Sequence, residues 1–289
     1  MRSIFAVVKT GCRFTTAGFL YLFCSPLLAS EVASEGVSEG VSEGVSEVSA
    51  YLGSSRWLYQ EHDSTGEELN REQGYLPGYW LSLATSLAPS HQWRVDWRRQ
   101  AGVLSYRGQT QSGVPHNTTT QEGSSRLRVG WRYQPQASGY WFQWWAGHEL
   151  WQRNIRASDG VAALNERYRW DLVMLDLGYN WRLNAQQRVT ISAQAGHLFN
   201  GELEVYLNRF GFGSPDIALK YGRLLGVAAD YQLALTERWR VTLKYQLEHR
   251  QFEQSRPVSA SNGVQTIQLR EPKNTLQSSA LWIGGSWFY

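Results

Sequence analysis

The chain has 289 residues, and 28 Lys and Arg against 25 Asp and Glu leave a formal net charge of only +3. Three of the basic residues lie in the first 13 positions, so the remainder is close to neutral, which argues against a nucleic-acid partner. The mean hydropathy is negative (−0.42), yet the chain holds 14 Trp, 15 Tyr and 10 Phe. So many aromatic residues in so polar a chain favour strands with one apolar and one polar face.

Residues 1–30 have the pattern of a secretory signal peptide. Three basic residues precede an apolar run at 17–28, and two small residues follow it. The run is too short to span a bilayer as a helix. Cys12 and Cys24, the two cysteines, both lie here, so we expect no disulfide and no Cys-ligated metal in the mature chain. A lipoprotein is not indicated, because bulky residues precede Cys24.

Residues 31–50 are of low complexity, with Glu-Gly-Val-Ser recurring between positions 35 and 46. The segment has no aromatic residue and a carboxylate at almost every fourth position, so it cannot bury enough apolar surface to fold by itself. We expect an acidic, disordered periplasmic tail. A tether to peptidoglycan or to a periplasmic partner is the alternative.

Residues 51–289 alternate between apolar and polar side chains, with turn residues in between. Short turns at 89–92, 134–139, 184–187 and 236–238 alternate with long loops at 62–74, 108–124, 157–166, 208–216 and 254–274. The ten predicted strands are 51–61, 75–88, 93–107, 125–133, 140–156, 167–183, 188–207, 217–235, 239–253 and 276–289. This organisation predicts an all-β fold, a transmembrane antiparallel up-and-down β-barrel of about ten strands with short periplasmic turns.

The two faces of the predicted strands differ in kind. Apolar residues point outward at every second position of strands such as 125–133 and 239–253. Two strands break this pattern, at Arg99 and near Val173, and a bulge in each would restore the phase. Two girdles of aromatic residues are expected at the membrane surfaces, Trp93, Tyr133, Tyr140, Trp181, Tyr231, Trp239 and Tyr289 beside the short turns and Tyr59, Tyr79, Tyr106, Phe199 and Tyr221 near the loops.

The chain ends in an alternating, aromatic strand, Leu-Trp-Ile-Gly-Gly-Ser-Trp-Phe-Tyr. Its Gly284, Trp287 and Tyr289 resemble the C-terminal β-signal of bacterial outer-membrane proteins, although that pattern usually has a polar residue where Trp282 stands. The resemblance implies a bacterial outer-membrane location, recognition by the barrel-assembly machinery, and contact with outer-membrane lipid and lipopolysaccharide. An ordinary edge strand that ends in aromatic residues is the alternative. The oligomeric state is left open.

The opposite parity places charged residues inside the barrel. We expect thirteen of them to line the lumen: Arg94, Asp96, Arg98, Arg126, Arg128, Arg132, Glu149, Arg153, Asp176, Asp230, Arg240, Lys244 and Glu248. In a narrow bore they would form ion pairs that pack the interior of a structural barrel. Alternatively, the excess of arginine would line a porin-like channel for small anionic solutes. Trp80, Trp145, Trp151 and Trp282 would then be either a stacking track for sugars or packing residues.

Enzymatic function is the runner-up. The omptin proteases resemble this chain in strand number, but the rim candidates His62, Asp63, Asp159, Asp216 and His249 lack the Asp-x-Asp and Asp-x-His spacing of that family. Alternation predicts that His148 and His197 point outward to the lipid. Histidines in that position are more often interfacial than catalytic. We therefore assign no catalytic residue, and the His spacing predicts neither metal nor cofactor. A rim-active hydrolase of omptin or lipid-modifying kind would need carboxylates, or a Ser beside a His, at the loop end. A surface adhesin acting through the long loops is the other alternative.

Overall fold

The computed structural model describes residues 46–110, 113–135, 138–158 and 160–289. The predicted signal peptide, and the predicted tail up to residue 45, lie outside the described residues. The elements are β1 Ser46–His62, β2 Glu68–Ala88, β3 His91–Gln109, β4 Pro115–Tyr133, β5 Tyr140–Ile155, β6 Leu164–Arg182, β7 Gln187–Tyr206, the 3-10 turn η1 Asn208–Phe210, β8 Asp216–Ala218, β9 Gly222–Ala234, β10 Trp239–Phe252, β11 Val258–Ser261, β12 Thr266–Leu269 and β13 Lys273–Phe288.

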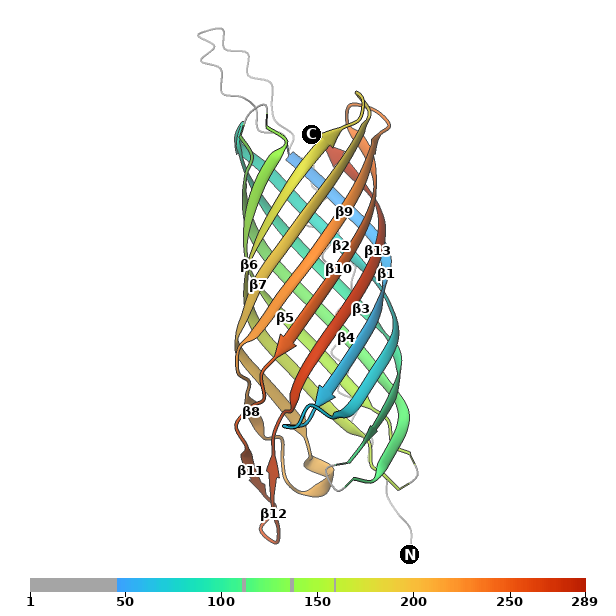
Figure 1. The fold of residues 1–289 in the computed structure, drawn as a ribbon, viewed down its shortest axis with the longest axis vertical. Helices are drawn as coiled ribbons and strands as arrows, with labels where there is room; N and C mark the ends of the chain where they lie inside the picture. Colours follow the sequence, from blue (N-terminus) through green and yellow to red (C-terminus); the bar gives the residue numbers. More distant parts are fainter. Residues whose placement is uncertain (1–45, 111–112, 136–137, 159) are drawn as a thin grey trace, which may run out of the picture. The chain divides into compact units, whose positions relative to one another are not determined.

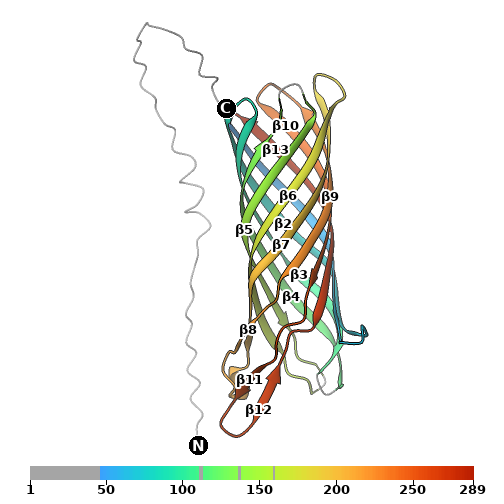
Figure 2. The ribbon, with the colours of Figure 1, turned by 60° about the vertical axis from the view of Figure 1, so that its left-hand side comes forward.

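Ten of these strands close into an antiparallel barrel (Figures 1 and 2). The ring runs β1, β2, β3, β4, β5, β6, β7, β9, β10 and β13, and β13 pairs with β1 along its whole length to close it. The short strand β8 pairs with β7, and β11 and β12 form a separate hairpin at the end away from the C-terminus. The predicted fold class and strand number are confirmed. No helix in the described part of the chain is long and apolar enough to cross a membrane.

Several strands are longer than predicted. β1 begins at Ser46, so residues 46–50, which were assigned to the tail, belong to the barrel. β2 and β4 begin at Glu68 and Pro115, so the predicted loops at 62–74 and 108–124 are mostly strand. The reason is that these stretches are polar on both faces, which removes the alternation by which a strand is recognised. The predicted eighth strand is instead divided into β8 and β9.

The two predicted bulges are absent. β3 pairs with β4 in unbroken register from His91 to Gln109, and Arg99 simply points outward. β6 also keeps one phase against β5 throughout. The register does shift between β6 and β7, where β7 contains Asn200, the non-glycine residue with a positive φ of 50°. The extra residue therefore lies on the neighbouring strand, and Asn tolerates this left-handed conformation better than most residues.

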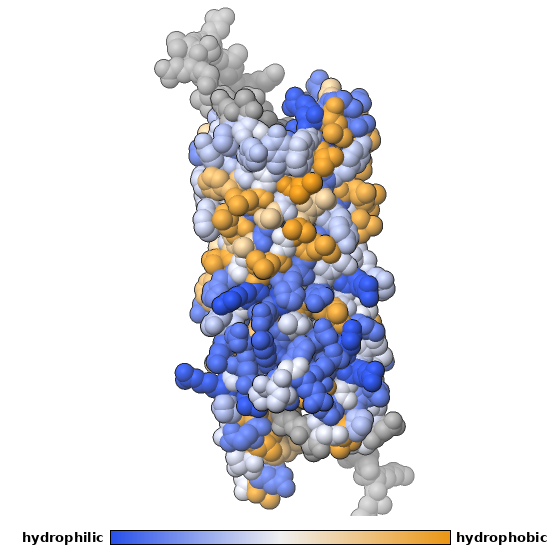
Figure 3. Space-filling view, viewed as in Figure 1, coloured by the Kyte–Doolittle hydropathy of each residue, from blue (hydrophilic) through white to orange (hydrophobic). Residues whose placement is uncertain are grey.

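The outer wall carries an apolar belt that covers only part of its height, as the face in Figure 3 shows. On β10 the outward residues from Trp239 to Leu247 are apolar and exposed, and the next two are His249 and Gln251. A transmembrane strand needs only about 9–11 residues, whereas β2 has 21. An exposed apolar belt around a closed, polar-filled barrel is the architecture of an integral outer-membrane protein. The rest of the wall, toward the loop end, is more polar.

The predicted girdle near the loops is wrong in part. Tyr59 and Tyr106 are 0% and 5% exposed and lie inside the barrel, because their parity puts them on the inner face. The outward aromatic residues at this edge of the belt include the pair Tyr79 and Trp97, whose ring centroids are 5.3 Å apart.

Glycines make room for the inward tryptophans. A Cβ at Gly130 would lie 2.4 Å from the Trp145 ring, and one at Gly53 would lie 2.6 Å from the Trp282 ring. In each case the glycine and the tryptophan lie on neighbouring strands. The missing side chain therefore lets a large ring lie flat against the inner wall.

Candidate functional site in the barrel interior

The structure places all thirteen charged residues of the predicted lumen on the inner face of the wall. They lie at three levels. Eight line a cavity next to the short turns: Arg94, Asp96, Arg128, Arg132, Asp176, Asp230, Arg240 and Lys244. Arg98, Arg126, Glu149 and Glu248 follow in the middle of the barrel, and Arg153 lies nearer the loops.

The cavity, which we call the vestibule, has a volume of about 620 Å³ and is also lined by residues of the short turns. Its deeper part contains two ion pairs. Asp96 accepts hydrogen bonds from Arg128 at 2.9 and 3.1 Å, and the Arg128 guanidinium lies 4.0 Å from the centroid of the Trp145 ring. Lys244 Nζ lies 2.9 Å from Asp230.

An ion-pair layer of Arg126, Glu149, Glu248 and Arg250 closes the bore beyond the vestibule. Arg126 bonds Glu149 at 2.7 Å and holds Glu248 with two bonds of 3.0 Å. Arg250 bonds Glu248 at 2.6 Å and Glu149 at 2.9 Å. The four side chains are 1–3% exposed. β4 and β10 are opposite each other in the ring, so these contacts span the bore.

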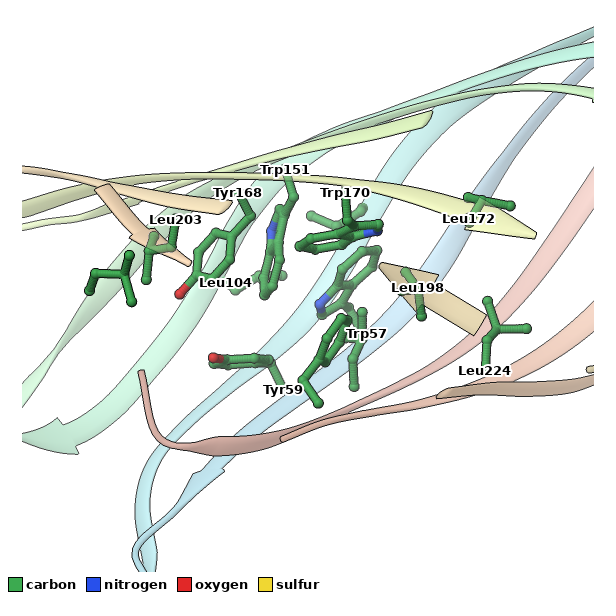
Figure 4. Close-up of a cluster of buried hydrophobic side chains, with 14 of the residues drawn as sticks. Trp57, Tyr59, Leu104, Trp151, Tyr168, Trp170, Leu172, Leu198, Leu203 and Leu224 are labelled. Carbon is green, nitrogen blue, oxygen red and sulfur yellow. The ribbon is translucent and has the colours of Figure 1, made fainter. Parts of the chain in front are cut away.

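An aromatic cluster fills the interior next to this layer (Figure 4). Trp151 stacks on Tyr168, with centroids 4.7 Å apart, and contacts Trp57 and Trp170 at 6.1 Å. A further cavity beside it measures only about 10 Å³, room for about one water. The inward tryptophans here pack against other side chains rather than lining an open path.

Arg153 lies among a group of buried carboxyls. Its guanidinium is 2.6 Å from Glu72, 2.8 Å from Glu166 and 3.2 Å from Glu61, and its Nε is 3.7 Å from Glu122. One buried cation cannot neutralise so many buried anions. Glu72 Oε2 and Glu122 Oε1 are also buried without a hydrogen-bond partner among the described residues.

Glu271, in the segment between β12 and β13, belongs to the same group. Its Oε1 accepts hydrogen bonds from Tyr59, Tyr168 and Asn274 at 3.1, 3.2 and 2.8 Å. Burial raises its pKa well above the ordinary value, and the nearby carboxylates of Glu61 and Glu166 raise it further. Through these three hydrogen bonds the loop residue anchors the segment to the barrel interior.

Among the rim candidates that the structure describes, no hydrogen bond or ion pair joins one to another. Asp63 caps its own loop by accepting bonds from Thr65 and Glu67, and the Thr65 hydroxyl is the main cause of its lowered pKa. His249 points outward, and Asp159 lies outside the described residues.

Two other histidine pairs do form. Ser158 Oγ lies 2.8 Å from His116 Nδ1 at the loop end. His148, exposed on the outer wall, lies 2.8 Å from Asp171, which Asn200 also bonds at 3.0 Å. Among the described residues no group of three or more His, Cys, Asp or Glu side chains is arranged to hold a metal ion.

Sequence reasoning missed several interior residues. Glu61, Arg188 and Arg250 lie on predicted strands with the inward parity, so a full count of inward positions would have found them. Four more inward residues lie in stretches that were predicted as tail or loop, where no strand was expected: Glu47, Glu72, Glu122 and Glu166. Glu271 lies outside a strand, where alternation gives no signal. Its place depends on how the segment folds back into the barrel.

Comparison with known proteins shows a similarity of fold and of nothing else. No protein-family model and no curated protein matches the sequence. Among solved structures, the outer membrane protease OmpT from Escherichia coli is similar over 88% of this chain and 99% of its own, with a TM-score of 0.52 and 10% identity. The translocator domain of the autotransporter NalP from Neisseria meningitidis matches over 84% of this chain and 88% of its own, at a TM-score of 0.42 and 8% identity, too weak to support an argument.

Proposed function

We propose that this protein is a closed structural barrel of the outer membrane, which holds its polar outer half and loops at the cell surface and does not conduct solutes. The ion-pair layer carries this proposal. Arg126 and Arg250 are each bonded to both Glu149 and Glu248, so these four charges neutralise one another, and Arg98 at the same level donates to Gln246 at 3.1 Å. Side chains that satisfy one another in a dry interior favour packing over permeation.

Conductance and stability, measured together, test the proposal. Refolded mature protein in a planar bilayer should show no single-channel conductance, under conditions in which a porin control conducts. Arg126→Met should leave Glu149 and Glu248 without one of their two cations, at a cost of about 3–5 kcal/mol of unfolding free energy. Arg99→Met removes the same charge from the outer wall and should change stability little.

A channel predicts the opposite results. Steady conductance by the wild type, together with an Arg126→Met variant as stable as Arg99→Met, would show that water solvates the layer and would rule out the closed barrel. A destabilised Arg126→Met in a non-conducting protein supports it.

The rim-active hydrolase is not favoured by the geometry. His116 Nδ1 contacts Ser158, but His116 Nε2 is buried without a hydrogen-bond partner among the described residues. A serine nucleophile needs a histidine that a third group orients and that faces the substrate. His148 has the acidic partner Asp171, yet no serine is bonded to it.

The proposed surroundings follow from the outer wall. The apolar belt would contact outer-membrane lipid, and the exposed Arg99 and Arg223 at its outer edge would meet the anionic headgroups of lipopolysaccharide. Residues 1–30 as a cleaved signal and Gly284, Trp287 and Tyr289 as the assembly signal complete this proposal.

A further inference from the structure

We propose that the vestibule is a binding site for a small, multiply charged anion of phosphate or carboxylate type, which enters from the periplasmic side. The cavity is lined by residues of the short turns and ends against the ion-pair layer, so it is a blind cup. Its volume of about 620 Å³ lies within the range of small-molecule sites, about 300–1,000 Å³.

Arginines face each other across the mouth of this cup. Arg94 and Arg132 lie on β3 and β4, and Arg188 and Arg240 lie on β7 and β10, on the opposite side of the ring. Gln232 links the second pair, since it is the strand partner of Arg188 and accepts a bond from Arg240 at 3.3 Å. We call these four residues the mouth arginines.

Carboxylates are fewer, because only Glu47 and Glu237 accompany these four arginines among the cavity residues nearest the short turns. Glu47 lies 3.9 Å from Arg94, a long ion pair. Arg132 donates to the amide oxygen of Gln143 at 3.0 Å and lies over the Trp141 ring at 4.0 Å. Within the described residues, no carboxylate lies within ion-pair distance of Arg132, Arg188 or Arg240. Three guanidinium groups are thus available to a ligand.

Buried donors point to the same chemistry. Gln143 Nε2 and Trp141 Nε1 line the cavity without an acceptor, in side chains that are 1% and 6% exposed. A buried N–H that lacks an acceptor is costly, and phosphate or carboxylate oxygens would satisfy both. Lys244 pairs with Asp230, whereas Asp176 receives a hydrogen bond from Trp145 and has no ion pair among the described residues. The carboxylate of Asp176 would repel an anion from the deeper part of the cavity, so the anion would stay at the mouth.

Titration calorimetry at low salt tests this, with the full barrel refolded in detergent and inorganic pyrophosphate or citrate as the probe. Saturable binding of one anion per barrel is expected. Arg188→Gln and Arg132→Gln should each weaken it roughly tenfold, the usual effect of losing a hydrogen bond to a charged group. Arg99→Gln and Arg223→Gln, on the outer wall, remove the same charge and should leave the affinity unchanged.

The outcomes separate clearly. Binding of pyrophosphate alone, citrate alone or both supports the site and selects the ligand class. No saturable binding to the wild type, or an equal loss in the outer-wall variants, overturns it. Arg188 makes no ion pair in the described structure, so Arg188→Gln decides the matter if Arg132→Gln does not fold. Retention of heat-modifiable mobility confirms that each variant is folded.

Discussion

The buried charged residues of this barrel form two groups that differ in the ratio of arginines to carboxyls. In the ion-pair layer, two arginines meet two glutamates, and each side chain is bonded to both opposite charges. Around Arg153, one guanidinium faces the carboxyls of Glu61, Glu72, Glu122 and Glu166, with Glu271 close by. In the first group the opposite charges are equal in number, so the carboxyls can all be ionised. In the second group the carboxyls outnumber the arginine, so some of them must stay protonated.

The first prediction concerns Glu271. Its raised pKa means that the folded state holds this proton more tightly than the unfolded state does. Its contribution to stability is complete below the ordinary value of 4.5 and is lost as the pH rises through the folded value, by up to about 1.4 kcal/mol per pH unit. Glu271→Gln keeps the accepting oxygen for Tyr59, Tyr168 and Asn274 and removes this proton.

The measurement is urea unfolding in lipid vesicles between pH 5 and pH 9. Glu271→Gln should unfold at a higher urea concentration than the wild type at the alkaline end and should depend less on pH. Glu67→Gln, on the exposed loop after β1, should follow the wild type at every pH. A Glu271→Gln curve that falls as steeply as the wild type would show that Glu271 is ionised in the folded state.

At the scale of single strands, alternation defines the inner and outer faces but not where the membrane ends. β3 shows this clearly. Its outward side chains are apolar from Trp93 to Trp97, and from Arg99 onward polar side chains appear on the same face, with no change of phase. The strand continues because its backbone pairs with β4 as before. We propose that only the surroundings of its outer side change, from lipid to water.

A matched pair of substitutions tests where the belt ends. Leu243 on β10 and Val103 on β3 both point outward, with 45% and 51% exposure. Leu243→Arg places a guanidinium in the belt and should cost about 2–4 kcal/mol near the midplane. Val103→Arg lies in the outer half, where water solvates it, and should cost less than about 0.5 kcal/mol. Unfolding in vesicles measures both, and equal costs would show that lipid covers the outer half as well.

At the scale of the whole barrel, closure depends on the first and the last strand, β1 and β13. Ser46 and Tyr289 exchange backbone hydrogen bonds of 3.2 and 3.1 Å, and Trp287 packs against Tyr289 at 5.1 Å. Gly284 has a structural role here, since a Cβ at this position would lie 2.3 Å from the Tyr51 ring. The segment proposed as an assembly signal is therefore also the closing strand.

Tyr289→Ala separates these two roles. The substitution removes the exposed ring but keeps both backbone bonds to Ser46. We expect less heat-modifiable, folded protein in outer membranes, and normal refolding of the purified chain into vesicles. Deletion of Phe288 and Tyr289 should impair both. Wild-type amounts of folded Tyr289→Ala in cells would argue against recognition through this ring.

The sequence alone determined the β-barrel, its ten strands and the inward parity of the thirteen charged residues, because a period of two is a local property of the backbone. It did not locate the ends of β2 and β4, where both faces are polar, or the bulge at Asn200. Only the tertiary structure decided which charges meet. Arg126 reaches Glu248 across 122 positions because closure brings β4 opposite β10, and no local pattern encodes such a contact. For the same physical reason, the choice between a packed interior and an open channel rests on the closed ring.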